Sequence, residues 1–345
     1  MKKTISLVLA LVIILSTFVA CAPAAAPPAA DGAAPGAAPE AADGLQPRSW
    51  RLGHNSSDWG TWNQGALRFA ALLYEYSGGM MVLDVFPNAQ LGDELEMVRS
   101  VQDGVIDFVI AGGHLVGFAP KAILADAPYL YADFDHLREV FDGPLGEIIH
   151  QNVIDYAFVR PIMYFIRGPR KLTANRPIHT PDDMSGLVIR VPPAYVVVAT
   201  FEALGATVVP MALGEVFTAL QQGVLDAQEN PLAMIDAQSF YEVQPYIMNT
   251  NHTVSLIWVT IGEELYQSLS PQEREIIHRA AAGAQAYEHE LFLEEEYRLY
   301  ALMEERGVTF IDVDFELFRD TAMDAIIESF DPEVRELFLE IANLR

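Results

Sequence analysis

The feature that most constrains the fold is one uninterrupted helical pattern near the carboxyl end of the chain. It begins at Ser270, where Ser-Pro-Gln-Glu combines an N-cap serine, a proline at the first helical position and a glutamate three residues after the cap. The pattern continues to about Arg306 and stops at Gly307. At about 1.5 Å per residue, about 35 residues span roughly 50 Å, more than one domain diameter. Such a helix is expected either to bend or to span two domains.

Shorter strand and helix patterns alternate through the rest of the chain. Strands are expected at 50–53, 80–86, 107–111, 159–166, 187–191, 207–211, 255–261 and 308–313. Helices are expected at 61–76 and 93–102, between most of the later strands, and after Asp331-Pro332. The apolar side chains at helical spacing in the first of these are Leu67, Ala70, Ala71 and Tyr74. This alternation is typical of α/β domains, and 345 residues allow about two of them.

Two short segments of the chain resemble each other. Residues 101–107 read VQDGVID and residues 220–226 read LQQGVLD. In both, a glycine is expected to end a helix, two apolar residues to enter the sheet and an aspartate to open the next strand. The similarity favours two related α/β domains, although two unrelated helix-to-strand turns would share the same pattern.

Charge and cysteine content exclude several classes of protein. The chain has 47 acidic and 21 basic residues, a formal net charge of −26. Nucleic acid is therefore not an expected partner, and an anionic membrane surface is a poor one. The single cysteine, Cys21, excludes disulfide scaffolds, cysteine-ligated zinc and iron–sulfur clusters within one chain.

The amino terminus predicts export. Residues 1–20 combine Lys2 and Lys3 with a nearly continuous apolar stretch, as a signal peptide does. Cys21 follows Ala20, a context that resembles bacterial lipoprotein signals and predicts acylation of Cys21; an ordinary signal peptide with an incidental cysteine is the alternative. Residues 21–46 are rich in Ala and Pro and predict a tether. The protein is thus expected outside the cytoplasm, in the periplasm or at the outer face of the cytoplasmic membrane, anchored by lipid alone.

Signatures of catalysis are missing from the sequence. It has no Gly-x-Ser-x-Gly turn, no P-loop and no dinucleotide-binding glycine pattern. His289-Glu290 is not followed by the second histidine of a zinc-protease helix, and the eight histidines form no metal-spaced pair. The sequence therefore predicts no enzyme, no cofactor and no metal site.

The strongest candidate for binding a ligand is Arg190. It lies in the apolar strand expected at 187–191. A buried guanidinium needs an anion, because an unpaired buried charge is very costly, and its planar fork suits a carboxylate. From these residues alone, that anion is either a ligand or one of the protein's own acids.

Two further polar segments are candidates. Residues 167–173 place three positive charges where one domain would pass to the next, which suits either a ligand site or a solvated crossover. Residues 226–231, Asp-Ala-Gln-Glu-Asn-Pro, suit either a polar site at a strand end or an ordinary turn.

Several ordered motifs together resemble one known family. One motif is Leu187–Pro192, which contains Arg190. The other motifs are the segments 87–94, 201–206, 210–215, 219–231, 241–244 and 250–252. Over about residues 49–340, the sequence resembles the DctP-type solute-binding proteins of TRAP transporters. The resemblance implies a two-domain α/β fold like that of type II periplasmic binding proteins, a flytrap with a long helix spanning both domains. It implies domain I at 47–167 with 256–295, and domain II at 168–255 with 296–345.

The resemblance also implies a function and residues that perform it. Such a protein binds a small organic acid between its domains and delivers it to the permease subunits of an ion-gradient-driven transporter. In the family, the arginine that matches Arg190 pairs with the ligand carboxylate, which favours the ligand as its anion. The other residues implied to contact or shape the ligand pocket are Arg170, Asn230, Asn55, Leu213, Gly113, Tyr195, Trp59 and His114. Leu213 stands where relatives often have Phe, and residues 111–113 lack an acid that some relatives place there, which makes an amino-bearing sugar acid a poorer candidate.

Three other functions stay open at this point. A receptor for a signalling partner would bind the same ligand, but its gene would have no permease genes beside it. A lipoprotein enzyme would convert an organic acid, and a structural surface protein would show no stabilisation by any ligand. The sequence does not identify the acid or the oligomeric state.

Overall fold

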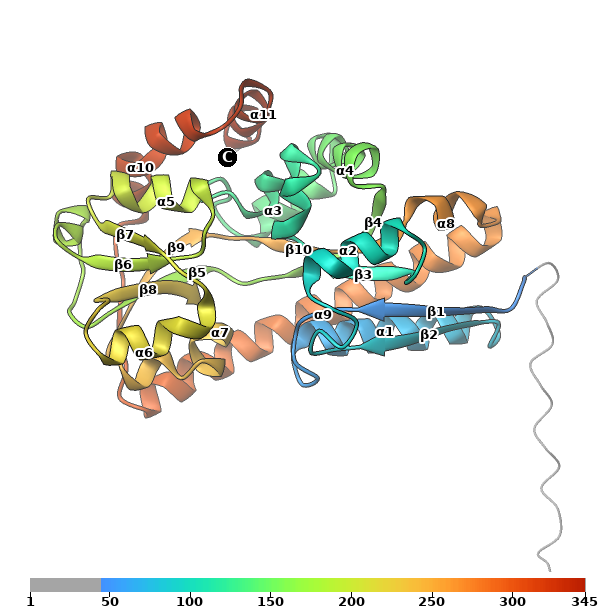
Figure 1. The fold of residues 1–345 in the computed structure, drawn as a ribbon, viewed down its shortest axis with the longest axis horizontal. Coiled ribbons are helices and arrows are strands. Elements are labelled where there is room, and N and C mark those ends of the chain that lie inside the picture. Colours follow the sequence, from blue (N-terminus) through green and yellow to red (C-terminus); the bar gives the residue numbers. More distant parts are fainter. Residues whose placement is uncertain (1–44, 345) are drawn as a thin grey trace, which may run out of the picture. The chain divides into compact units, whose positions relative to one another are not determined.

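A computed structural model of the protein describes residues 45–344 (Figure 1). The α-helices in this range are α1 (Thr61–Tyr76), α2 (Glu94–Gln102), α3 (Phe134–Phe141), α4 (Pro144–Ala157), α5 (Tyr195–Ala203), α6 (Val216–Gln221), α7 (Leu232–Ala237), α8 (Glu263–Ser268), α9 (Pro271–Glu305), α10 (Phe315–Ser329) and α11 (Pro332–Ala342). The short 3₁₀ helices are η1 (Gly113–Gly117), η2 (Pro120–Asp126), η3 (Pro181–Met184), η4 (Leu213–Glu215) and η5 (Phe240–Glu242). The predicted signal peptide, Cys21 and nearly all of the tether lie outside the described residues.

The strands form two mixed sheets. The first sheet holds, in spatial order, β2 (Met81–Phe86), β1 (Arg48–Gly53), β3 (Phe108–Ala111), β10 (Leu256–Gly262) and β4 (Val159–Ile166). The second holds β11 (Thr309–Ile311), β9 (Tyr246–Thr253), β5 (Arg170–Ala174), β8 (Ala227–Pro231), β6 (Val188–Val191) and β7 (Thr207–Pro210). In each, the first three strands pair in parallel and the next two pairings are antiparallel, so that one strand, β10 or β5, runs against its neighbours. The order β2-β1-β3-β10-β4 thus matches β7-β6-β8-β5-β9. The two-domain α/β fold predicted from the sequence is confirmed.

The two similar helix-to-strand turns occupy matching positions in these sheets. Gly104 and Gly223 adopt φ values of +68° and +69°, a left-handed conformation that glycine reaches without a steric penalty. Asp107 then accepts a backbone N–H from β1 at 2.8 Å, and Asp226 accepts one from β6 at 3.0 Å. Each aspartate therefore ties the start of its strand to the neighbouring parallel strand.

Only one residue of each apolar pair is buried. Ile106 and Leu225 are buried, but Val105 and Val224 are 56% and 60% exposed. The prediction that both residues enter the sheet is wrong, because the strands begin after the pairs, at Phe108 and Ala227.

Helix α1 has the predicted bounds but not the predicted buried face. Leu67 and Tyr74 are 51% and 54% exposed. The stripe that is buried consists of Ala66, Phe69, Leu72 and Leu73. This stripe faces the first sheet and helix α9, against which α1 packs along its length. Contact with the neighbouring helix, rather than hydrophobicity alone, selects which apolar residues are covered.

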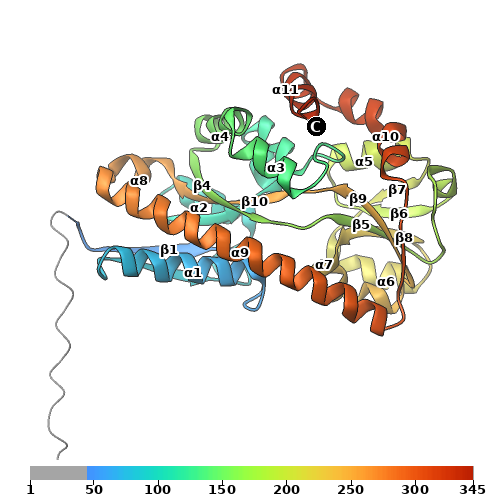
Figure 2. The ribbon, with the colours of Figure 1, turned by 180° about the vertical axis from the view of Figure 1, so that it is seen from behind.

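Helix α9 begins and ends close to the predicted positions. The hydroxyl of Ser270 accepts the backbone N–H of Glu273, whose carboxylate in turn accepts the backbone N–H of Ser270. The first half of α9 packs into the core of the first sheet, with Ile277 fully buried, and its last turns bury Leu299 and Met303 in a core of the second sheet. Figure 2 shows α9 passing along α1 and then α7. One helix therefore contributes to the cores of both sheets.

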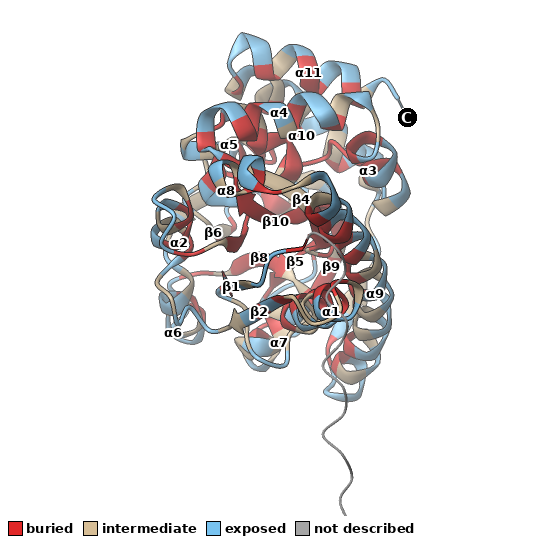
Figure 3. Cartoon of the chain, turned by 90° about the vertical axis from the view of Figure 1, so that its right-hand side faces the viewer, coloured by how far each residue is buried: buried red, intermediate tan, exposed pale blue. Residues whose placement is uncertain are grey.

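The sequence patterns do not predict the strands β5 and β9, because these are rich in polar residues, whereas the strand that Asp226 is expected to open is present as β8. Strand propensity reflects how side chains pack, and polar side chains give a poor signal of it. Both β5 and β8 are nevertheless buried almost completely (Figure 3). The solvated crossover at 167–173 and the ordinary turn at 226–231, left open above, are therefore wrong.

The chain passes between the sheets at residues 166–170 and 253–256. There the backbone N–H of Arg167 donates to the carbonyl of Ser255 at 3.1 Å, which joins the two crossings. The domain boundaries stay a prediction. Two observations concern these boundaries. Leu45, assigned to the tether, is only 5% exposed. Lys121 of η2, assigned to domain I, pairs at 2.9 Å with Glu333 of α11, assigned to domain II.

Within residues 45–344, no helix combines the length and the apolar character that a membrane crossing requires.

A substitution at Gly65 tests the close contact between α1 and α9. A Cβ atom at this position would lie 2.7 Å from the ring of Phe165 and 3.0 Å from Cβ of Glu288. We expect Gly65→Ala to lower the free energy of unfolding by about 1–3 kcal/mol through overpacking. Urea unfolding measures this, with Gly117→Ala as the control because a Cβ there meets nothing within 4 Å. Equal stability of the two variants would contradict the packing described.

Candidate functional site

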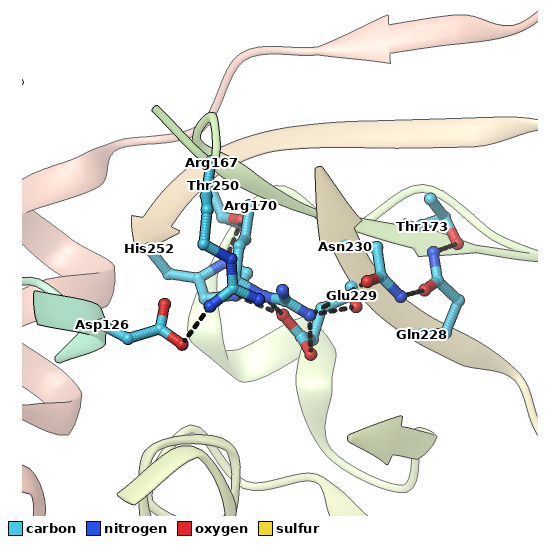
Figure 4. A network of polar contacts seen from close by, with 9 residues as sticks. All are labelled: Asp126, Arg167, Arg170, Thr173, Gln228, Glu229, Asn230, Thr250 and His252. Atoms are coloured by element: carbon cyan, nitrogen blue, oxygen red, sulfur yellow. Dashed lines mark hydrogen bonds and ion pairs between the residues drawn. The ribbon is translucent and has the colours of Figure 1, made fainter. Parts of the chain in front are cut away.

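A network of buried polar side chains connects three strands of the second sheet (Figure 4). Arg170 on β5 forms a two-pronged ion pair with Glu229 on β8, in which Nη2 lies 2.8 Å from Oε1 and Nε contacts Oε2. His252 on β9 places its Nε2 3.0 Å from Oε2 of the same glutamate. Its Nδ1 lies 2.8 Å from the hydroxyl oxygen of Thr250. The side chains of Glu229 and His252 are almost completely inaccessible to solvent.

The network fixes the protonation states of these groups. Burial alone opposes ionisation of Glu229, but the charge of Arg170 and the hydrogen bonds from Arg170 and His252 bring the pKa of Glu229 down to about 2. Burial lowers the pKa of His252, so its imidazole is neutral near pH 7. Since Glu229 is ionised and accepts only, Nε2 of His252 carries the proton and Nδ1 accepts the hydroxyl of Thr250. Arg170 and Glu229 therefore form a neutral unit.

The network continues from Arg170 to Asn230. Nη2 of Arg170 donates to Oδ1 of Asn230 at 3.1 Å, and Nδ2 of Asn230 donates to Oε1 of Gln228 at 2.6 Å. Gln228 donates in turn to the hydroxyl of Thr173 at 3.0 Å. The orientation of the Asn230 amide is thus set by neighbours on both sides.

Arg190 has a different environment. It lies on β6 between β7 and β8, and it is 4% exposed. Both Nε and Nη2 donate to the carbonyl oxygen of Met211, at 2.9 and 2.7 Å. Burial lowers the pKa of Arg190, yet an arginine stays charged in proteins. No carboxylate within the described residues forms an ion pair with it, so the internal ion pair that the sequence left open is not present there.

A cavity of about 200 Å³ lies beyond the end of β6. It is mainly apolar, and its polar wall includes Asp126 and Arg167. The lining residues come from Gly112 and η1, from η2, from the crossover after β4, from the start of α5 with the two residues before it, and from the first residue of β10. They are Gly112, Gly113, Val116, Ala122, Ile123, Ala125, Asp126, Arg167, Pro193, Ala194, Tyr195, Val196, Val197 and Leu256. Of the residues predicted from the sequence, Gly113 and Tyr195 line this cavity. Arg190 does not, although Pro193 follows it by only three residues.

The other predicted residues lie elsewhere. Arg170 and Asn230 belong to the buried network described above. Asn55 and Trp59 lie in the exposed loop after β1, where Trp59 is 76% exposed. Leu213 is half-buried and packs against a core cluster of the second sheet. The structure therefore does not gather all the predicted residues around one cavity.

An acid lies next to the segment that the sequence marks as lacking one. Glu94, at the start of α2, accepts the backbone N–H of Gly112 at 2.8 Å and faces Nδ1 of His114 at 3.3 Å. The hydrogen bond that the imidazole of His114 donates to Glu94 raises the pKa of His114, whose side chain is 55% exposed. His114 thus forms a contact of its own, close to the cavity wall.

The sequence placed Arg167 and Glu229 only within candidate segments and gave neither a role of its own, and it assigned no role to His252, Asp126 or Glu94. Glu229 and His252 stand inside the Gln-Glu-Asn-Pro and Thr-Asn-His motifs, so the motifs pointed to the right place. Asp126 and Arg167 lie 41 positions apart, and their pairing follows only from the fold.

Comparison with known proteins gives a consistent picture. The model of the DctP family, bacterial extracellular solute-binding protein family 7, matches residues 52–339. A solute-binding protein of Roseobacter denitrificans is 41% identical over 292 residues, 85% of this chain and 90% of that protein. The 2,3-diketo-L-gulonate-binding periplasmic protein of Escherichia coli K12 is 30% identical over 293 residues, 84% of this chain and 89% of that protein.

A solved structure extends the comparison to the fold. It is a TRAP periplasmic solute-binding protein from Roseobacter denitrificans with bound L-galactonate. It matches with a TM-score of 0.76 at 40% identity, and the match covers 86% of this chain and 99% of that one. The relatives with which this chain shares sequence and fold are solute-binding proteins of transport.

Removal of the charge on Glu229 tests the buried ion pair. We expect Glu229→Gln to lower the free energy of unfolding by about 3–5 kcal/mol, because Arg170 would remain buried without a counter-charge. Arg160 and Glu263 form a similar two-pronged pair at 2.7 Å, but their side chains are 24% and 19% exposed. Glu263→Gln is therefore the matched control, with an expected cost of about 0–1 kcal/mol. Denaturant unfolding of both variants checks this, and equal losses would show that burial of the Arg170 pair does not matter.

Proposed function

The chain belongs to the DctP family of bacterial extracellular solute-binding proteins, family 7, and on that premise we propose that it binds a small hydroxylated carboxylate outside the cytoplasm and delivers it to the permease subunits of a TRAP transporter. The proposal treats the protein as a receptor that releases its ligand unchanged. Its partners are then one organic acid and the membrane subunits of the transporter.

One observation carries the proposal. The guanidinium of Arg190 is buried, charged and bonded to a carbonyl oxygen but to no carboxylate of the described chain. A charge in this position is costly until an anion joins it, and a carboxylate accepts two parallel N–H bonds from the arginine fork. Arg190 is therefore the proposed anchor of the ligand carboxylate.

The neighbouring network suggests roles for Arg170 and Asn230. Both are nearly buried, and Oδ1 of Asn230 keeps a second lone pair after its bond from Arg170. We place them beside the anchor as further ligand contacts whose orientation Glu229 and Gln228 maintain. Gly113 and Tyr195 contribute to the cavity wall, and ligand contacts by Asn55, Leu213 and Trp59 stay predictions.

The relatives suggest the class of acid. The similar structure from Roseobacter denitrificans holds L-galactonate, a sugar acid, at 40% identity to this chain. Asp126 and Arg167 give the otherwise mainly apolar cavity wall polar groups that can bond hydroxyls, which supports a sugar acid as the proposed class of ligand.

Calorimetry with L-galactonate tests the anchor. We expect Arg190→Gln to weaken binding by about 2–5 kcal/mol, because the ligand carboxylate would lose a buried charged partner. Arg190→Lys should also weaken it, since an ammonium cannot replace the planar fork. Arg298→Gln, an exposed arginine paired with Glu295 on α9, serves as the control.

Thermal unfolding without ligand confirms that each variant is folded. Unchanged affinity in a folded Arg190→Gln variant would refute the anchor. Chemical conversion of L-galactonate during incubation with the protein would favour an enzyme instead.

We also propose that Cys21 is acylated and holds the protein at the membrane after the signal peptide is removed. The support is the position of the single cysteine directly after the apolar segment. We expect mass spectrometry of the mature protein to show lipid on an amino-terminal Cys21, and Cys21→Ser to release the protein from membranes. An unmodified Cys21 in the mature protein would refute the anchor.

A further inference from the structure

A second ion pair lies in the wall of the cavity. Arg167 stands on the crossover directly after β4, and Asp126 is the last residue of η2. Nη1 of Arg167 lies 3.0 Å from Oδ2 of Asp126, and the two side chains are 23% and 35% exposed. Figure 4 shows this pair beside the buried network, with the guanidinium of Arg167 near that of Arg170. The pair therefore belongs to the cavity wall and lies close to the buried network.

The pair has unused hydrogen-bonding capacity. Within residues 45–344, the side chain of Arg167 donates only to Asp126, and Oδ1 of Asp126 is buried without a partner. The N–H donors of Arg167 and the acceptor Oδ1 of Asp126 therefore lie next to each other in the cavity wall. A hydroxyl group both donates and accepts, so it can satisfy the two residues together, whereas a carboxylate only accepts and is repelled by Asp126.

The neighbouring backbone leaves room for a ligand at this wall. A Cβ atom on Gly112 would lie 3.9 Å from Nη1 of Arg167, and a Cβ atom on Gly113 would meet nothing within 4 Å. The Cβ atom on Gly112 would also lie 3.3 Å from the side chain of Ile257. The two glycines, which both line the cavity, thus leave open space beside Arg167.

The charges of the region suit one carboxylate. Arg167 is paired with Asp126, and Arg170 is paired with Glu229, while His252 is neutral. Of these three arginines, only Arg190 has no carboxylate partner within residues 45–344. A ligand with two carboxylates would place its second negative charge against the Arg167–Asp126 pair. This pair has no net charge, and Asp126 would repel the second carboxylate.

We propose that Arg167 and Asp126 form a specificity subsite that binds hydroxyl groups of the ligand and selects hydroxylated monocarboxylates over dicarboxylates. The proposal rests on the proposed function, because it concerns the part of the same ligand that extends away from Arg190. Arg190 binds the carboxylate, and the Arg167–Asp126 pair forms hydrogen bonds with the hydroxyl groups of the ligand.

Calorimetry with L-galactonate and succinate tests the subsite. We expect Asp126→Asn to weaken L-galactonate at least 10-fold and to strengthen succinate, since an unpaired Arg167 would accept a second carboxylate. We expect Arg167→Gln to weaken L-galactonate at least 10-fold while succinate stays weak. Asp135→Asn breaks an exposed ion pair with Arg138 on α3 and serves as the control, with no expected change for either acid.

The outcomes separate this proposal from the proposed function. If L-galactonate affinity is unchanged in folded Asp126→Asn and Arg167→Gln but falls in Arg190→Gln, the subsite is wrong and the anchor stands. If succinate gains nothing in Asp126→Asn, the selection against dicarboxylates is wrong. Wild-type protein that binds neither acid overturns the proposed function and the subsite with it.

Discussion

The candidate site depends on how the second sheet compensates its buried charges. A buried guanidinium without an anion costs several kcal/mol, and Arg170 avoids this cost through Glu229, which also accepts a hydrogen bond from His252 on β9. Arg190, two strands away from Arg170, has only the carbonyl of Met211. The other buried cation of the sheet, Lys171 on β5, donates to the side-chain oxygen of Asn251 at 2.9 Å. In the proposed function, the ligand carboxylate supplies the anion that Arg190 lacks, which would link the stability of the sheet to the occupancy of the site.

The two sheets share a topology but differ in chemistry. In the first sheet, β3 and β10 are almost entirely apolar, whereas the matching strands β8 and β5 carry the buried network. The charged anchor therefore belongs to the second sheet. The cavity wall also contains Gly113, which follows β3, and Asp126, the last residue of η2. A ligand that contacts both the second sheet and these cavity-wall residues stabilises the conformation in which both reach it. A two-domain receptor closes around its ligand in this way.

Sequence patterns predicted the elements whose signal is local. Helix α1, helix α9 and strand β4 have the expected bounds because periodicity, the Ser270 cap and an apolar run define them within a few residues. The buried face of α1 and the strands β5 and β9 escaped prediction, because contacts with distant segments decide them. Arg190 was found from a charge inside an apolar strand. The pairs of Arg170 with Glu229 and of Arg167 with Asp126 join residues 59 and 41 positions apart, which no local pattern reveals.

The central claim is that Arg190 retains a positive charge which only the ligand neutralises. The most direct measurement compares the affinities of the wild-type protein for L-galactonate and for its primary amide, which has the same hydroxylated chain without the charge. The account predicts that the amide binds at least about 100-fold more weakly, which corresponds to roughly 2.7 kcal/mol. Equal affinities for the acid and the amide would contradict it, because the buried charge of Arg190 would then have no part in binding.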